Sequence, residues 1–231
     1  NVSPSTVPRA LKNNPDVSQE TRDMIHAYAN EHNYKPNVQA VNLRAGRSNT
    51  IGVIVPQMVH HFFSCVLSGI EQAASKAGYN IIVAQSNESY EQEVKIVHSF
   101  LAARVCGVIA SLAKETARYD HYQELLNNDI PIVFYDRICT GIKTERVVVD
   151  DYAGSFAAVE YMIQTGCRRI FFYGAAPHLE ITKNRRNGYL DAMKKYKIPV
   201  DDQMILLCDT RERTIANTPD LLESPVRPVG F

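Results

Sequence analysis

The stretch Asn37–Pro56 reads NVQAVNLRAGRSNTIGVIVP and marks the point at which the sequence changes character. It begins with a short apolar-periodic segment, passes through the basic run Arg44–Asn49 and ends in the largely β-branched run Ile51–Val55. Short helical segments precede it, whereas β-branched runs alternate with longer helical patterns after it. The sequence therefore predicts a small helical unit, a basic connector and an α/β body.

The composition is that of an ordinary globular protein. Its 231 residues are 45% hydrophobic and 22% charged, and the formal net charge is zero, which disfavours a protein that coats nucleic acid without regard to sequence. Residues 1–48 contain six Lys and Arg against four Asp and Glu, a net of +2, so the remaining residues carry −2. A positive N-terminal part suits contact with DNA, and the rest of the chain is nearly neutral.

The five cysteines are odd in number and include no CxxC pair. This pattern favours reduced thiols over a disulfide framework or a metal site. No run is long and apolar enough to span a membrane, and there is no signal peptide. We therefore expect a cytoplasmic protein without a metal ion or cofactor. Because the first residue is Asn and the opening lies within a motif, we also expect the true N-terminus to lie further upstream.

Two short helices are predicted before the connector. Residues 2–12 form the first, with Ser3 as its N-cap and Pro4 in the first helical position. Ser18 can cap the second, which ends near Asn33. The apolar stripe of the second helix would consist of Met24, Ile25, Tyr28 and Ala29.

The body alternates strands with helices, which implies parallel sheets in doubly wound order. The predicted strands are 51–55, 80–84, 105–110, 130–135, 146–149, 169–173 and 204–207. The predicted helices are about 62–77, 90–103, 119–128, 152–165, 184–196 and 212–222. Ligands bind such sheets outside the carboxyl ends of the strands. This rule directs attention to Pro56–Phe63, Ser86–Asn87, Asp136–Arg137 and the segment after Tyr173.

Three stretches closely resemble the lactose/galactose-repressor (LacI/GalR) family. They are VSPSTVPRAL at 2–11, VSQETRDMIHAYANEHNYKPN at 17–37 and NLRAGRSNTIGVIVP at 42–56. The resemblance continues through the body and covers nearly the whole chain. It implies a helix-turn-helix headpiece in 1–36, a hinge helix and linker in 37–49, and an effector-binding, periplasmic-binding-protein-like domain of two subdomains in 50–231.

In that family the first stretch is the recognition helix, which lies in the major groove of DNA. The resemblance places Pro4, Ser5 and Arg9 at positions that face base edges or nearby phosphates, and Thr6 at a backbone-contacting position. From the residues alone, a surface helix would be the simpler interpretation. Pro8 stands where the family usually has Ser. In a helix that begins at Pro4 it is the fifth position, where proline costs roughly 3 kcal/mol or somewhat less, so the helix is bent or starts later.

Residues 37–45 resemble the hinge helix of the family, which folds on DNA when two protomers bring their hinges together. There Leu43 would be the wedge that opens a base step from the minor groove. Ala40 would let the paired hinges approach closely, and Arg44 would follow the minor groove or the phosphates. The alternative for Leu43 is a linker residue packed on its own domain.

The resemblance also implies a small effector, such as a sugar, bound between the two subdomains. Phe62 and Phe63 match the aromatic pair of the family and can stack on a sugar or base face, although core packing suits Phe63 equally well. Asp136 and Arg137 match the Asp-Arg pair after the fourth strand of the body, for which a salt bridge at a strand end is the rival interpretation.

Two further positions complete the expected effector site. Arg185 lies in RRNGY and matches a family arginine that reaches into the cleft, whereas a helix-borne arginine is usually solvated. Asp150 lies in VVVDDYAG at a strand end near the crossing between the subdomains. The end of the sequence, Leu221–Phe231, resembles a family segment after which the chain runs on. We therefore expect the second subdomain to be incomplete.

The leading interpretation is a dimeric transcriptional regulator that binds a palindromic double-stranded operator and couples this binding to its effector. The alternative is a periplasmic-type sugar-binding protein, which would lack residues 1–48 and is therefore disfavoured by VSPSTVPRAL and NLRAGRS. A third possibility is the product of a damaged gene that binds neither partner. Catalysis is not expected, because His60 and His61 are adjacent and His178 and Glu180 occur without a nucleophile elbow or an HExxH motif.

Overall fold

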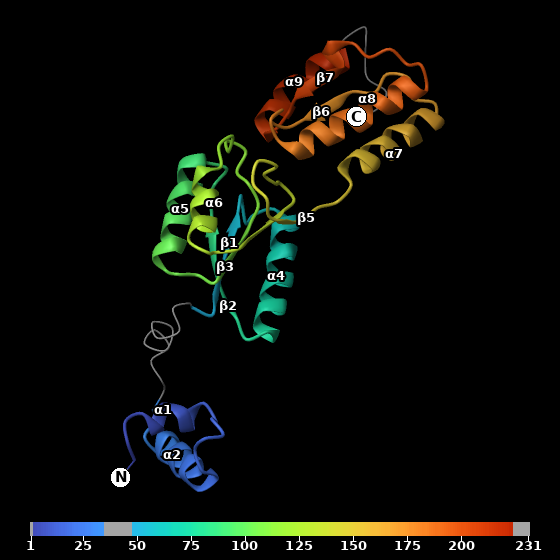
Figure 1. The fold of residues 1–231 in the computed structure, drawn as a ribbon. Coiled ribbons are helices and arrows are strands. Elements are labelled where there is room, and N and C mark those ends of the chain that lie inside the picture. Colours follow the sequence, from blue (N-terminus) through green and yellow to red (C-terminus); the bar gives the residue numbers. More distant parts are fainter. Residues whose placement is uncertain (1, 35–47, 224–231) are drawn as a thin grey trace. The chain divides into compact units, whose positions relative to one another are not determined.

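The computed structural model describes residues 2–34 and 48–223 (Figure 1). Its internal contacts divide the chain into two compact units, Asn1–Ser48 and Asn49–Phe231. We call them the N-terminal unit and the α/β unit, and describe each by itself. The predicted hinge helix at 37–45 lies outside the described residues. Within the described residues, no helix has both the length and the apolar character needed to cross a membrane.

The N-terminal unit contains two helices, α1 (Thr6–Leu11) and α2 (Gln19–Glu31). The Ser18 side chain caps α2 by accepting a hydrogen bond from the Thr21 N–H at 3.4 Å, which is the predicted capping interaction. The buried residues of the unit form one small core in which both helices and their connection take part. They are Ala10, Val17 and Ile25, with Val7 and Leu11 packed against them.

Helix α1 begins later than the sequence predicts, and this resolves the position of Pro8. Ser5 is the N-cap and Thr6 the first helical residue, so Pro8 is the third helical residue. The Thr6 N–H is bound by the Ser3 carbonyl at 2.9 Å, which closes a turn before the helix. Backbone N–H groups in the first helical turn have no intrahelical acceptor. Proline at this position therefore removes no helical hydrogen bond, and Pro4 lies in the preceding turn.

The predicted apolar stripe of α2 is only partly correct. Ile25 is buried, whereas Met24 and Tyr28 are 54% and 63% exposed. The short α1 covers one side of α2, and Met24 and Tyr28 lie outside the part that it covers. The Tyr28 ring instead contacts His32 one turn later on the same helix, with the ring centroids 4.1 Å apart.

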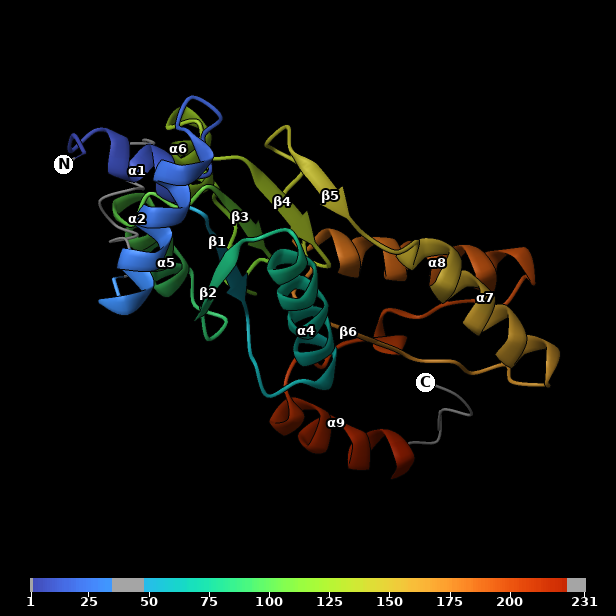
Figure 2. The ribbon, with the colours of Figure 1, turned by 90° about the horizontal axis from the view of Figure 1, so that it is seen from below.

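The α/β unit begins with a parallel five-stranded sheet in the order β2-β1-β3-β4-β5. Helices α5 and α6 cover one face and α4 covers the other (Figures 1 and 2), which confirms the doubly wound prediction. The strands are β1 (Thr50–Val55), β2 (Asn80–Gln85), β3 (Gly107–Ala110), β4 (Ile132–Tyr135) and β5 (Glu145–Val147). The helices are α4 (His61–Lys76), α5 (Tyr90–Ala102) and α6 (Asp120–Asn127).

The core between this sheet and α5 is densely packed. Phe100 of α5 lies so close to Gly52 of β1 that a Cβ on Gly52 would be 2.4 Å from the Phe100 ring. The absence of a side chain at Gly52 therefore admits the aromatic ring to the sheet. Ile54, Val108, Ile132 and Phe134 belong to the same core.

A buried polar cluster fixes the loop that follows β3. The Glu93 carboxylate on α5 accepts hydrogen bonds from the Ala113 N–H at 2.7 Å and from the Thr116 hydroxyl at 2.8 Å. The Nε2 atom of His121 lies 3.0 Å from Oε1 of the same carboxylate. Both oxygens of this buried carboxylate have hydrogen-bond partners, so the cluster holds residues 113–116 against α5 and α6.

The second part of the α/β unit surrounds a parallel pair of strands, β6 (Phe172–Gly174) and β7 (Ile205–Leu207). Helices α7 and α8 lie on one side of the pair and α9 on the other (Figures 1 and 2). The helices are α7 (Asp151–Gln164), α8 (Glu180–Lys195) and α9 (Arg211–Glu223), and a short 3₁₀ turn spans Asp202–Met204. Helix α8 begins four residues before the predicted start.

Helices α7 and α8 are in close contact at Gly188. A Cβ on this residue would lie 2.4 Å from the Tyr152 carbonyl oxygen and 2.9 Å from the Phe156 nitrogen. The glycine of the RRNGY segment therefore lets the two helix backbones approach each other. Beside this contact lies a core that includes Val159, Ile163, Ile170, Tyr189 and Met193.

Candidate functional site

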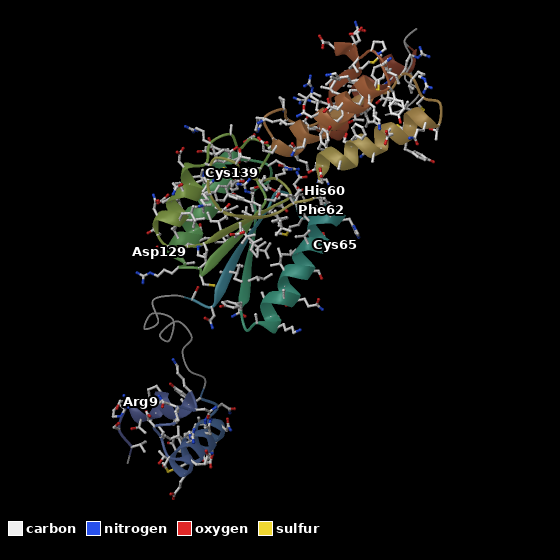
Figure 3. All side chains as sticks on the ribbon, turned by 45° about the vertical axis from the view of Figure 1, so that its right-hand side comes forward. Arg9, His60, Phe62, Cys65, Asp129 and Cys139 are labelled. Atoms are coloured by element: carbon white, nitrogen blue, oxygen red, sulfur yellow. The ribbon has the colours of Figure 1, made fainter. Side chains whose placement is uncertain are left out.

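A cleft of about 780 Å³ lies between the two sheets of the α/β unit. Its lining residues come from the carboxyl ends of the strands in both sheets, as the rule for open α/β sheets predicts. Figure 3 shows two of them, His60 and Phe62, at the N-terminal end of α4. Six strands contribute a lining residue at their carboxyl end or in the segment that follows it. These residues are Phe63 after β1, Glu88 after β2, Lys114 after β3, Asp136 after β4, Gly174 at the end of β6 and Asp209 after β7.

The two aromatic residues of the cleft differ in exposure. Phe63 is 4% exposed and Phe62 is 50% exposed. The rings meet edge to face with centroids 5.2 Å apart, and Phe63 meets Tyr135 in the same way at 6.3 Å. Phe63 thus joins the core, in agreement with the packing alternative, while it also lines the cleft and supports Phe62. Phe62 offers an aromatic surface to a ligand.

Arg137 is held mainly by Glu88. Its Nη1 donates to Glu88 Oε2 at 2.7 Å, whereas the nearest approach to Asp136 is 4.0 Å from Nε. The guanidinium also lies over the Phe63 ring, 5.9 Å from its centroid. The salt bridge that was the rival interpretation for Arg137 therefore exists, but its main partner is Glu88 and not Asp136.

Asp136 has an unusual backbone conformation, with φ of 56°. This left-handed conformation is uncommon outside glycine and recurs at functional positions. Burial raises the pKa of the Asp136 carboxyl above its ordinary value, and the nearby Arg137 and Arg185 oppose this only in part. The site therefore holds a partly desolvated carboxyl group, which can accept hydrogen bonds from ligand hydroxyls.

Arg185 and the start of α7 form the opposite wall. The Arg185 Nε donates to Asp151 Oδ1 at 2.8 Å, and both residues line the cleft. Asp150 does not belong to the lining, because its carboxylate caps α7 by accepting from the Ala153 N–H at 2.8 Å. The predicted placement of Asp150 in the pocket is thus corrected by one residue, to Asp151.

Lys114 connects the two parts of the unit. Its Nζ donates to the Asp209 carbonyl oxygen at 2.6 Å, and the Asp209 carboxylate accepts from Arg213 at 2.7 Å. Neither Lys114 nor Glu88 was predicted from the sequence. Glu88 directly follows the indicated Ser86–Asn87 segment, and the strand-end rule applied to β3 would have indicated Lys114.

The predicted DNA-contacting residues lie around the start of α1. Pro4, Ser5 and Arg9 are exposed and Thr6 is half-buried; Figure 3 shows Arg9 on this helix. The Ser3 hydroxyl lies 2.8 Å from both the Ser5 and the Thr6 hydroxyl, which orders the residues before the helix. The other three predicted positions, Ala40, Leu43 and Arg44, lie outside the described residues.

Groups of three or more potential metal ligands are absent from the part of the chain that the structure describes. The buried Tyr135 hydroxyl, which belongs to a cleft residue, has no hydrogen-bond partner among the described residues. Burial raises the pKa of Tyr135, so this group remains a hydrogen-bond donor. A ligand hydroxyl or a bound water can satisfy it.

Comparison with known proteins identifies relatives for both units. The HTH-type transcriptional regulator MalR of Streptococcus pneumoniae is 33% identical over 214 residues, which cover 90% of this chain and 64% of MalR. The chain thus spans less than two thirds of that relative.

Two solved structures share the fold. The transcription regulator CcpA of Lactococcus lactis matches with a TM-score of 0.70 at 24% identity, over 77% of this chain and 65% of CcpA. A periplasmic binding protein/LacI transcriptional regulator of Alkaliphilus metalliredigens, complexed with D-xylulofuranose, matches with a TM-score of 0.65 at 26% identity, over 76% of this chain and 64% of its own.

Two family descriptions account for nearly the whole sequence. Residues 48–227 match the periplasmic binding proteins and sugar binding domain of the LacI family, and residues 1–37 match the bacterial regulatory proteins of the lacI family. The chain belongs to the LacI family of bacterial regulatory proteins.

Proposed function

We propose that this protein is a sequence-specific transcriptional regulator whose affinity for DNA depends on a small effector, a sugar or sugar derivative, bound in the cleft. The observation that carries the proposal is the presence in one chain of a LacI-type helical unit and a sugar-binding-type unit with a lined cleft. No catalytic step belongs to this function, which is a coupling of two binding equilibria.

In the proposed complex, the N-terminal unit reads DNA through α1. Arg9 contacts guanine or phosphate, because a guanidinium can donate two parallel hydrogen bonds, and Pro4, Ser5 and Thr6 contact neighbouring base edges or the backbone. Leu43 enters the minor groove from the hinge, with Ala40 and Arg44 beside it.

The effector lies against the exposed Phe62 ring and exchanges hydrogen bonds with Asp136, Arg137 and Arg185. The partly exposed aromatic face, the desolvated carboxyl group and the two guanidinium groups fit a hydroxylated ring. Asp151 takes the place first expected for Asp150. The structure of the Alkaliphilus relative, which is complexed with D-xylulofuranose, supports an effector of this kind.

We further propose a homodimer that acts in the cytoplasm. A dimer presents two copies of α1 to the two half-sites of a palindromic operator, so that each protomer supplies half of the contacts. Effector binding would change the geometry of the pair and thereby the affinity for the operator.

Selection of binding sites from random duplexes tests this function. The chain is compared with a form extended by the segments that its longer relatives carry, and affinity is measured across a salt series. We expect a palindrome to be selected and its affinity to fall steeply with salt. If neither protein selects a sequence while sugar binding persists, the protein is a sugar-binding protein without DNA binding.

A further inference from the structure

The arginines of the cleft are each engaged by a carboxylate. Arg137 is bound by Glu88 at 2.7 Å and Arg185 by Asp151 at 2.8 Å. The first pair is poorly hydrated, since the Arg137 and Glu88 side chains are only 15% and 14% exposed. An ion pair in such a place is weakly screened by solvent and hard to separate.

The remaining charges around the cleft cancel as well. The Lys114 ammonium is bound to the Asp209 carbonyl, the Asp209 carboxylate is bound to Arg213, and Asp136 adds a further carboxylate to the lining. Apart from His60, which contacts Gln57, the described lining residues and Arg213 contribute four basic and four acidic groups. They are Lys114, Arg137, Arg185 and Arg213 against Glu88, Asp136, Asp151 and Asp209.

Glu88 is built into this arrangement through its backbone and its side chain. Asn87 and Glu88 both have left-handed backbones, with φ of 54° and 63°. The Glu88 Oε2 that binds Arg137 also accepts from the Lys114 N–H at 2.8 Å. One carboxylate thus joins the segments that follow β2, β3 and β4, and it is held where it meets the guanidinium.

We propose that Glu88 determines the ligand class of the cleft, because it neutralises Arg137 and so restricts the site to uncharged, polyhydroxylated ligands. A phosphate group that used the remaining Arg137 N–H groups would lie beside the part-buried Glu88 carboxylate, so that two anions would share a poorly hydrated place. A neutral hydroxyl can use the remaining guanidinium N–H groups without breaking the pair. The inference rests on the proposed function, since it names the effector class of the same cleft.

The test is isothermal titration calorimetry of the full chain with pairs of neutral sugars and their phosphate esters. Ribose with ribose 5-phosphate and glucose with glucose 6-phosphate serve as probes. In whichever pair the wild-type protein binds, we expect its affinity for the neutral sugar to exceed its affinity for the phosphate ester by about tenfold or more. Tighter or equal binding of the ester would overturn the proposal, and this measurement needs no variant.

A matched pair of variants locates the effect. Glu88→Gln keeps an oxygen for the Lys114 N–H but removes the charge from Arg137, so the preference should shift by about tenfold toward the ester. Glu115→Gln makes the same charge change at an exposed position, where the side chain binds the Tyr90 N–H, and should leave the preference unchanged. An unchanged preference in a folded Glu88→Gln variant would overturn the proposal.

These results are separate from those for DNA binding. Sugar affinities are measured without DNA, so a protein that selects no operator can still support the proposed role of Glu88. Conversely, a wild-type preference for esters would overturn that role while leaving the operator selection intact.

Discussion

Arg185 of α8 donates a hydrogen bond to Asp151 of α7 at 2.8 Å, so that the two helices meet at the edge of the cleft. The arginine predicted to reach a ligand is therefore already positioned by a protein carboxylate. Such positioning lowers the entropy lost when a ligand is bound.

Replacing Arg185 by Ala should weaken sugar binding by about tenfold while changing stability little. The guanidinium is half exposed, and Asp151 lies in the first turn of α7, where the helix N–H groups stabilise its charge. We expect the free energy of unfolding to fall by no more than about 1 kcal/mol. Calorimetry and urea denaturation measure the two quantities, with the adjacent exposed Arg186→Ala as control. An equal loss of affinity in both variants would remove Arg185 from the site.

Replacing Asp136 by Asn should stabilise the protein at neutral pH. Because burial raises the Asp136 pKa in the folded state, the ionised carboxylate opposes folding above that pKa. This destabilisation is relieved as the pH falls through the raised pKa toward the ordinary carboxyl value. The stability gain of the variant should therefore shrink over the same interval in urea titrations at successive pH values.

The matched control for Asp136→Asn is Asp129→Asn. Asp129 has a nearly identical backbone conformation, with φ of 58° against 56°, but is exposed at the end of α6 (Figure 3). Any benefit of Asn in a left-handed conformation is common to both variants. If the two variants show the same dependence on pH, the effect does not arise from the burial of Asp136.

Replacing Gly188 by Ala should destabilise the α/β unit by about 1–3 kcal/mol. The added methyl group would lie 2.4 Å from the Tyr152 carbonyl, so α7 and α8 would have to separate. Gly154→Ala is the contrasting variant, because Gly154 lies within α7 and a methyl group added there would meet no neighbouring atom within 4 Å. Alanine there should stabilise the helix by roughly 0.5–1 kcal/mol. Denaturation of both variants in urea gives the comparison, and a neutral Gly188→Ala would contradict the close contact.

Replacing Pro8 by Ser should change the stability of the N-terminal unit by less than about 1 kcal/mol, because position three of α1 has no helical acceptor for the restored N–H. Ala10→Pro should cost about 3 kcal/mol or more, since it lies where the helical ladder has begun and is fully buried. Thermal unfolding followed by circular dichroism distinguishes the two. A large gain from Pro8→Ser would mean that proline strains α1.

Replacing Arg9 by Ala should weaken binding to the selected operator by about 1–3 kcal/mol. Lys76→Ala removes an exposed positive charge from the last turn of α4 in the other unit and should have little effect. Fluorescence anisotropy with operator and random duplexes measures both. Unchanged specific affinity in Arg9→Ala would exclude Arg9 from the recognition surface.

The strands were the most predictable part of the fold. All seven lie within three residues of their predicted bounds. The apolar signal is plainest in β1, β3 and β4, because much of each of these strands is buried in a parallel sheet. The start of α8, in contrast, was missed because the sequence carries no capping signal there. Its N-cap residue is Leu179, whose side chain is buried and makes no capping hydrogen bond. The residues that usually mark this position, Ser, Thr, Asp and Asn, are therefore not found at this boundary.

The cleft was predicted in position but not in its internal pairing. The strand-end rule depends on topology, which the alternation of strands and helices reveals. The partner of Arg137, in contrast, lies 49 residues earlier in the chain, and no local spacing connects the two. Asp150 and Asp151 illustrate the same limit, because adjacent carboxylates become distinguishable only when α7 assigns one to its cap and the other to the cleft.

The buried Glu93 cluster has an evolutionary consequence. A descendant that loses Thr116 or His121 passes through a state in which the buried Glu93 carboxylate has one hydrogen bond fewer, at a cost of about 1–3 kcal/mol. That is a large part of the stability of a typical domain. The loop that carries Lys114 is therefore hard to change by single mutations, whereas replacing the exposed Phe62 costs little stability. New ligand preferences in this lineage should arise first at Phe62.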